Sequence, residues 1–208
     1  MPKFGLFGGS FDPPHIGHLR LARSAADAFG LDTVFIVPSG NSPGKHVPFA
    51  DDYDRFLMCE MTFTNDDSRF VIDNRELRRG GVSYTIDTLR ELQSQYSPEA
   101  VTAASLANNW CLIAGEDCLA SFHTWMDYRE ILRTAFLAIA RREQGGAPFK
   151  HSRLSPNERS HVRFIDAEPT VISSTELRAA IQVRQDFSDF VVPGVAEFIT
   201  REGLYRQD

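Results

Sequence analysis

Short apolar runs alternate with amphipathic segments along most of the chain. Runs rich in β-branched and aromatic residues are typical of strands that are buried on both faces of a sheet. They predict strands at residues 4–7, 33–37, 70–72, 110–114, 135–139 and 162–165. Apolar residues at helical spacing predict helices over about 19–29, 52–63 and 83–96. This alternation predicts an α/β fold with a Rossmann-like open, mainly parallel sheet and helices on both of its faces.

Capping signals predict three further helices in the last third of the chain, two of them in a C-terminal helical segment. Ser155 and Ser173 are each followed three residues later by glutamate, and this capping box predicts a helix that begins just after each serine. A last helix over about 195–201 should end at Gly203, because glycine readily adopts the left-handed conformation that closes a helix.

Composition bounds the class of protein. The 208 residues fit one domain spanning 1–208, and 42% hydrophobic with 24% charged residues is ordinary for a globular chain. The net charge of −6 argues against nucleic acid or an anionic membrane as a partner, so any phosphate ligand needs a local basic pocket.

Cys59, Cys111 and Cys118 show no CxxC spacing, which argues against a disulfide framework or a thiolate zinc site. With no signal-peptide pattern or spanning segment either, we expect a cytoplasmic protein.

The first predicted strand leads into a glycine-rich turn at residues 8–18, which reads GGSFDPPHIGH. Glycines allow a ligand to approach the backbone closely, and the N-terminus of the following helix offers free N–H groups, so an anion is the expected guest. His15 and His18 lie three residues apart and can point to the same side as donors to phosphate oxygens. The chain holds neither GxGxxG nor GxxxxGK[ST], which argues against a dinucleotide oxidoreductase and a P-loop NTPase.

Two other interpretations of this turn stay open. One histidine could be a satisfied core residue and the other a solvent-facing one. Asp12, His15 and His18 could also form a zinc site with an open position, as in a zinc hydrolase. Zinc helices more often place paired histidines four residues apart, and no fourth ligand stands nearby, so we assign no residue as a metal ligand.

A second cluster of polar residues begins the helix predicted after residue 173. Ser173, Ser174 and Thr175 offer hydroxyls and free N–H groups, and Arg178 adds a forked cation one turn later. These groups together predict a phosphate clamp. The plainer alternative is a capping box with a surface arginine.

Four segments of the chain resemble one family. Residues 9–18 resemble the GxFDPxHxGH signature of the nucleotidyltransferases that share HxGH with class I aminoacyl-tRNA synthetases, and 172–178 resemble their ISSTxIR segment. Residues 75–89 are similar to the REL(K/R)R…SYTxxTL stretch of the bacterial nicotinate-nucleotide adenylyltransferases, and 115–125 to their GxD…TW segment. The resemblance to that family covers nearly the whole chain.

The resemblance implies adenylyl transfer from ATP, with Mg²⁺, to nicotinate mononucleotide, which gives nicotinate adenine dinucleotide and pyrophosphate in NAD biosynthesis. It leaves open transfer to nicotinamide mononucleotide or another phosphorylated acceptor, and a non-catalytic nucleotide-binding protein. Family members are monomers or dimers, so a homo-oligomer also stays open.

The resemblance also implies roles for individual residues. His15, His18, Lys45 and Arg178 would be catalytic. ATP would contact Gly8, Gly9, Ser10, Phe11, His15, His18, Lys45, Ser173, Ser174, Thr175 and Arg178. The acceptor would contact Ser83, Tyr84, Thr85, Asp117, Trp125 and Arg141. In this assignment Trp125 stacks on the pyridine ring, Thr85 binds its carboxylate and Asp117 binds ribose, although a tryptophan is more often a core residue and Asp117 could simply cap a helix.

The chain departs from the family pattern in two places. The glycine- and proline-rich loop expected at 39–51 reads SPGK where the family has a PPHK-like run, so Gly44 replaces a histidine before Lys45 and His46 follows. Met126 stands where an aromatic residue is common.

Overall fold

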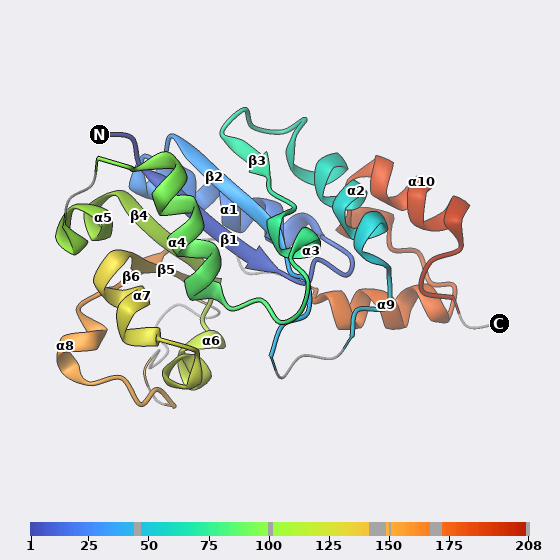
Figure 1. The fold of residues 1–208 in the computed structure, drawn as a ribbon. Helices are drawn as coiled ribbons and strands as arrows, with labels where there is room; N and C mark the ends of the chain where they lie inside the picture. The colour runs from blue at the N-terminus through green and yellow to red at the C-terminus, as the bar shows by residue number, and fades with distance from the viewer. Residues whose placement is uncertain (44–46, 100–101, 142–148, 150, 167–171, 207–208) are drawn as a thin grey trace.

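The computed structural model describes residues 1–43, 47–99, 102–141, 149, 151–166 and 172–206 (Figure 1). In this part of the chain six strands form one sheet in the order β3-β2-β1-β4-β5-β6, and each neighbouring pair is parallel. The strands are β1 (Phe4–Gly9), β2 (Thr33–Pro38), β3 (Phe70–Ile72), β4 (Trp110–Gly115), β5 (Phe136–Ala140) and β6 (Val162–Ile165). The predicted open parallel sheet is confirmed.

The helices before β4 are α1 (Ile16–Phe29), α2 (Asp52–Phe63), α3 (Arg75–Arg78), α4 (Thr85–Tyr96) and α5 (Ala103–Asn109). After β4 come α6 (Cys118–Ser121), the 3-10 turn η1 (Phe122–Thr124), α7 (Tyr128–Thr134), α8 (Pro156–Arg159), α9 (Ser174–Gln182), the 3-10 turn η2 (Ser188–Phe190) and α10 (Pro193–Glu202).

Each face of the sheet has its own buried core, as expected for helices on both sides. On one face Leu89 of α4 and Ile131 of α7 pack with Leu112 and Leu137 of the central strands. On the other face the small residues of α1 and the apolar residues of α2 cover Ile36 and neighbouring strand residues. In Figure 1 α4 and α7 accordingly lie in front of the sheet and α1 behind it.

The last helices form a third cluster rather than covering the sheet. Leu177 of α9 and Phe198 of α10 are buried with Met58 of α2, and Figure 1 shows α10 beside α2 at the end of the molecule away from β5 and β6. This is the predicted C-terminal helical segment. That residues 1–208 form one domain stays a prediction.

The local signals for helix ends agree with the structure. Gly30 and Gly203 adopt left-handed conformations with φ of 61° and 67° at the ends of α1 and α10. Ser155 and Ser173 both form capping boxes. The helix expected from about residue 83 begins two residues later, because the chain is still extended at Tyr84 (ψ 141°). The short helices α3, α5 and α7 were not predicted, since seven residues or fewer show little periodicity.

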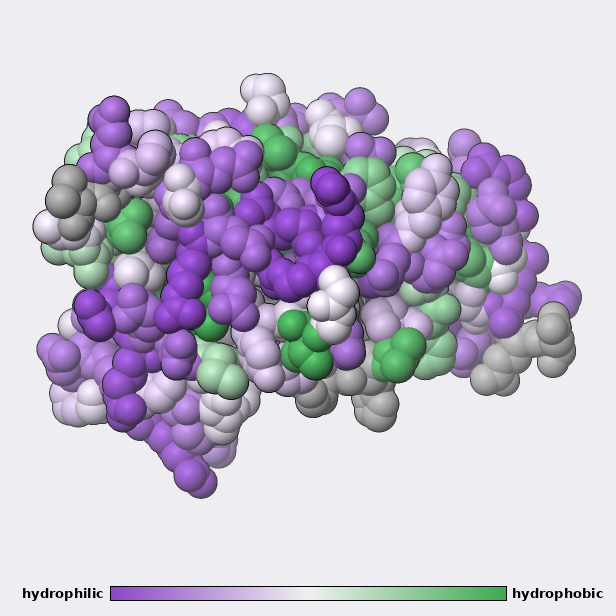
Figure 2. Space-filling view, in the orientation of Figure 1, coloured by the Kyte–Doolittle hydropathy of each residue, from purple (hydrophilic) through white to green (hydrophobic). Residues whose placement is uncertain are grey.

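The surface is mostly hydrophilic on the face drawn in Figure 2, with hydrophobic side chains in small separate groups. Cys59, Cys111 and Cys118 are free thiols, and burial raises the pKa of Cys118 to about 12. Among the helices described here, none has the length and apolar character needed to cross a bilayer.

Candidate active site

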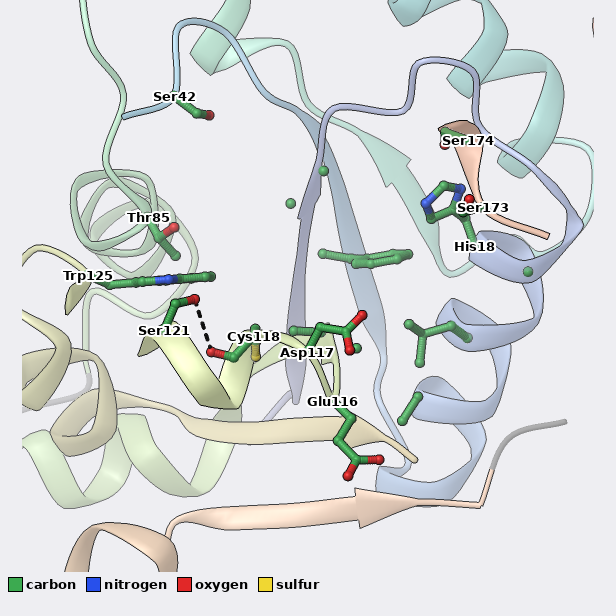
Figure 3. A pocket seen from close by; sticks show the side chains of 18 of the residues that line it. His18, Ser42, Thr85, Glu116, Asp117, Cys118, Ser121, Trp125, Ser173 and Ser174 are labelled. Atoms are coloured by element: carbon green, nitrogen blue, oxygen red, sulfur yellow. Dashed lines mark hydrogen bonds between the residues drawn. The ribbon is translucent and has the colours of Figure 1, made fainter. Parts of the chain in front are cut away.

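A cavity of about 1470 Å³ lies at the carboxyl ends of β1, β4 and β5. Its position is where the strand order reverses between β1 and β4, the place where open parallel sheets bind their ligands. Figure 3 shows two groups of side chains on opposite sides of it: His18, Ser173 and Ser174 on one side, and Thr85 and Trp125 on the other. Asp117 lies between them.

The turn after β1 brings its backbone to the cavity wall and buries its side chains. Gly8 and Gly9 line the cavity, and a Cβ on Gly9 would meet the Phe11 ring at 3.1 Å. Phe11 is only 1% exposed and packs against His18 with ring centroids 5.1 Å apart. Below the turn, the fully buried Arg55 donates from Nη1 to the Ser10 carbonyl at 2.8 Å. Ser10 and Phe11 therefore support the cavity, and their predicted contacts with ATP stay predictions.

His15 and His18 stack on each other at the start of α1, with ring centroids 3.7 Å apart, and both line the cavity. The backbone N–H of His15 donates to Nδ1 of His18 at 3.2 Å. A nitrogen that accepts carries no proton, so the proton of His18 is on Nε2. Burial lowers the pKa of His15 to about 4, and burial together with His15 lowers the pKa of His18. Both rings are therefore neutral near pH 7, and Nδ1 of His15 is buried with no partner among the described residues.

The carboxylate of Asp12 is buried and hydrogen-bonded to backbone groups. It accepts hydrogen bonds from the backbone N–H groups of Phe49 at 2.8 Å and Ala50 at 3.1 Å, which ties the loop before α2 to the turn. Both oxygens are thus engaged. No group of three His, Cys, Asp or Glu side chains suited to a metal ion occurs in the described ranges, so this geometry gives no support to the zinc alternative.

The start of α9 joins the first motif directly. Oγ of Ser174 donates to the Pro13 carbonyl at 2.9 Å, across 161 residues of sequence, and Ser173 and Ser174 both line the cavity. Arg178 donates from Nη1 to the Asp12 carbonyl at 2.6 Å, and its guanidinium carbon lies 4.5 Å from the centre of the Phe49 ring. Arg178 and Thr175 are not among the cavity-lining residues, so the predicted role of Arg178 on the leaving group requires its side chain to change position.

The opposite wall comes from the start of α4 and from η1. Ser83, Tyr84 and Thr85 line it, and the Ser83 hydroxyl is buried without a hydrogen-bond partner among the residues described. Trp125 faces Thr85 in Figure 3 and rests on Phe122, with ring centroids 5.2 Å apart. Trp125 is partly buried: it packs against the edge of the core on this face and also lines the cavity, so its stacking role stays a prediction.

The tryptophan of the core is Trp110, at the start of β4. It is fully buried, stacks on Phe4 at 4.7 Å and donates from Nε1 to the Ser97 hydroxyl at 3.0 Å. The chain's two tryptophans thus divide between packing and the cavity.

The remaining predicted contacts lie at the ends of β4 and β5. Asp117 lines the cavity and is also the N-cap residue of α6, although its side chain makes no capping hydrogen bond there. Arg141 also lines the cavity, with its guanidinium carbon 4.4 Å from the centre of the Phe164 ring.

Lys45, with Gly44 and His46, lies outside the described residues, as does Arg142. Sequence reasoning missed Glu116, Cys118 and Ser121, which line the cavity only because β4 ends there.

Comparison with known proteins gives consistent relatives. The family model described as cytidylyltransferase-like matches residues 6–180. The chain is 35% identical to a probable nicotinate-nucleotide adenylyltransferase of Neisseria meningitidis serogroup C, with 100% of both chains covered. It is 34% identical to one of Chromobacterium violaceum, with 98% of this chain and 99% of that one covered.

Solved structures show the same fold at lower identity. A putative nicotinate-nucleotide adenylyltransferase from Vibrio parahaemolyticus superposes with a TM-score of 0.68 at 20% identity, covering 100% of this chain and 98% of that one. A nicotinic acid mononucleotide adenylyltransferase of Plasmodium falciparum, complexed with NaAD, superposes with a TM-score of 0.71 at 17% identity, covering 99% and 98%.

Proposed function

The chain belongs to the cytidylyltransferase-like family and, within it, to the nicotinate-nucleotide adenylyltransferases, and from that premise we propose how its cavity works. The enzyme transfers the adenylyl group of ATP to nicotinate mononucleotide and releases pyrophosphate, which yields nicotinate adenine dinucleotide for NAD biosynthesis. One observation carries the proposal: the Ser174 hydroxyl bonds to the Pro13 carbonyl, so both phosphate motifs border one cavity opposite Thr85 and Trp125.

The chemistry needs no side-chain base. A phosphate oxygen of the mononucleotide, already ionised at neutral pH, attacks the α-phosphorus of ATP. The bond from that phosphorus to the bridging oxygen breaks, and pyrophosphate leaves with the electron pair. Catalysis then rests on positioning and on stabilising the charge that develops at the α-phosphate.

The neutral histidines supply that stabilisation as hydrogen-bond donors. The His15 backbone N–H occupies Nδ1 of His18, which leaves the Nε2–H of His18 to donate to an α-phosphate oxygen. A donor fixed before the reaction costs no reorganisation in the transition state. Glycine backbone at Gly8 and Gly9 and the hydroxyls of Ser173 and Ser174 would hold the remaining phosphates.

The residues described here form no preformed cage for a divalent ion, which fits an ion held mainly by the nucleotide's own phosphates. Mg²⁺ brought in with ATP would neutralise the charge that builds on the departing pyrophosphate. Lys45 would assist it, and Arg178 would do so after releasing the Asp12 carbonyl.

The acceptor wall favours an acid over an amide. The ring carboxylate would meet the amino end of α4, where the first N–H groups have no partner within the helix, together with the hydroxyls of Thr85 and Ser83. A neutral amide has no negative charge that the positive end of the helix dipole could stabilise. Trp125 would stack on the pyridine ring from the other side.

Pyrophosphate release from ATP tests the proposal. Nicotinate mononucleotide, nicotinamide mononucleotide and phosphopantetheine are each supplied with ATP and Mg²⁺, and we expect release to be fastest with the nicotinate form. Faster release with another acceptor would overturn the roles of Thr85 and Trp125 and leave those of the phosphate motifs. No release with any of them would favour the non-catalytic nucleotide-binding alternative.

A further inference from the structure

A buried polar cluster joins α3 to α4 behind the acceptor wall. Glu76 of α3 is 8% exposed and Thr88 of α4 is fully buried. Oγ1 of Thr88 donates to Oε1 of Glu76 at 2.7 Å and accepts from Nη1 of Arg79 at 3.2 Å. Nη2 of Arg79 in turn pairs with Glu91, one turn further along α4, at 2.9 Å. None of these side chains lines the cavity.

The same short helix also holds the loop that follows β2. A Cβ on Gly40 would lie 2.4 Å from the carbonyl oxygen of Glu76, so the loop backbone rests directly on α3. The next residue, Asn41, forms a parallel bridge with Val82 and accepts the backbone N–H of Ser83 at 2.9 Å. The segment that presents Ser83 and Thr85 to the cavity is therefore linked to α3 twice. Before Ser83 the link is the Gly40–Asn41 backbone, and after Thr85 it is the bond from Thr88 to Glu76.

The cluster is directional in a way that apolar packing is not. An apolar contact between α3 and α4 tolerates small shifts along either helix, whereas a buried carboxylate and hydroxyl lose their bond when the donor moves. Thr88 lies one turn after Thr85, so its bond to Glu76 fixes the rotation of the first turn of α4. That turn carries Thr85 at the cavity wall.

We propose that Glu76, Thr88 and Arg79 are positioning residues that set the orientation of Thr85 and thereby the affinity for the nucleotide acceptor. This inference rests on the proposed function, because it takes the wall at Ser83–Thr85 as the acceptor side. The hydrogen bonds and the ion pair described above join the cluster to α4, and none of them reaches His18, Ser173 or Ser174, so we expect the main effect on the acceptor.

Thr88→Val tests the inference, since it removes the hydroxyl and keeps the shape of the side chain. We expect the KM for nicotinate mononucleotide to rise about three- to tenfold, with the KM for ATP and kcat within about twofold, because misplacing one binding group weakens only the substrate it holds. Thr88→Ser keeps the hydroxyl and should restore the KM of the unaltered enzyme. Thr62→Val is the matched control, because Thr62 is a buried threonine of α2 whose hydroxyl donates to the Met58 carbonyl at 2.7 Å.

Arg79→Lys is a second variant that tests the same inference if Thr88→Val fails to fold. A lysine cannot bridge Thr88 and Glu91 as the guanidinium does, so the same KM should rise by a smaller factor. Arg69→Lys is its control, because Arg69 bridges Asp67 and Asp27 next to β3, at the amino ends of the strands.

Unchanged acceptor KM in both variants overturns the inference, and so does an equal rise in the KM for both substrates or a failure of Thr88→Ser to restore it. An unaltered enzyme that releases no pyrophosphate with any acceptor overturns the proposed function and the inference with it. The two failures are distinguishable, because the first occurs in an active enzyme.

Discussion

The two sides of the cavity are built differently. On the phosphate side the residues form hydrogen bonds with each other directly. Ser174 donates to the Pro13 carbonyl and Arg178 to the Asp12 carbonyl, and the backbone N–H of His15 donates to the His18 ring. On the acceptor side Thr85 and Trp125 come from separate segments, and much of their support lies behind them, in α3 and Phe122. The phosphate side is thus held together by bonds between its own residues, with Arg178 the one that has to leave its partner to reach a phosphate, whereas the acceptor side depends on residues behind it for its shape.

Removing the imidazole of His18 should give the largest effect. We expect His18→Ala to lower kcat about 10²- to 10³-fold, the usual cost of losing one donor to a developing charge, with little change in the KM for ATP. Steady-state kinetics of pyrophosphate release would measure both constants. His151→Ala, at an exposed histidine, is the control, and a loss that appears equally in the KM for ATP would contradict the role of His18.

Removing the indole of Trp125 should affect the other side alone. Stacking of a base on an aromatic side chain contributes about 1–3 kcal/mol, so Trp125→Ala should raise the KM for the mononucleotide by about tenfold and leave the KM for ATP near its original value. Trp125→Phe keeps a flat face and should recover most of the loss. A mononucleotide KM that does not change in the alanine variant would remove Trp125 from the binding site.

Breaking the bond between the two motifs should have a smaller effect on the phosphate side. Ser174→Ala loses one hydrogen bond, a net loss of about 1 kcal/mol, so kcat/KM for ATP should fall about fivefold. Ser160→Ala is matched to it, since the Ser160 hydroxyl donates to the Asn157 carbonyl at 2.7 Å away from the cavity. The idea fails if both serine variants lose the same activity.

The neutral histidines predict a modest dependence of stability on pH. The unfolded chain binds a proton at each histidine below about pH 6.5, whereas folded His15 does so only near pH 4. In that interval the unfolded state holds more protons, so the free energy of unfolding decreases as the pH falls from about 6.5 toward 4. Urea denaturation at pH 7 and pH 5 would measure the decrease, and His15→Asn should make it smaller. An identical decrease in the variant would show that other groups cause it.

How much of the structure the sequence predicts depends on whether a feature is local or is made between distant segments. The strands, the glycine caps and the two capping boxes depend on neighbouring residues, and all of them agree with the structure. The stacking of His15 on His18 is also local, since the residues lie one turn apart. Arg178 shows the limit: its forked cation suggested a phosphate ligand, but its hydrogen bond goes to a carbonyl 166 residues away.

The supports behind the acceptor wall show a second limit. Glu76 and Thr88 belong to a segment that the family resemblance singled out, yet their side chains meet only because an unpredicted four-residue helix turns Glu76 inward. Gly40 likewise reads as an ordinary loop glycine until the carbonyl of Glu76 appears beside it.

The bond from Ser174 to Pro13 also joins residues that the ribosome adds at very different times. The ribosome makes the glycine turn among the first residues, and the serines that face it only after more than four fifths of the chain. A nascent chain that ends before α9 lacks the wall of the phosphate site that Ser173 and Ser174 form. The two segments that border the phosphate site are thus made far apart in time, and the bond from Ser174 to Pro13 joins an early product of translation to a late one.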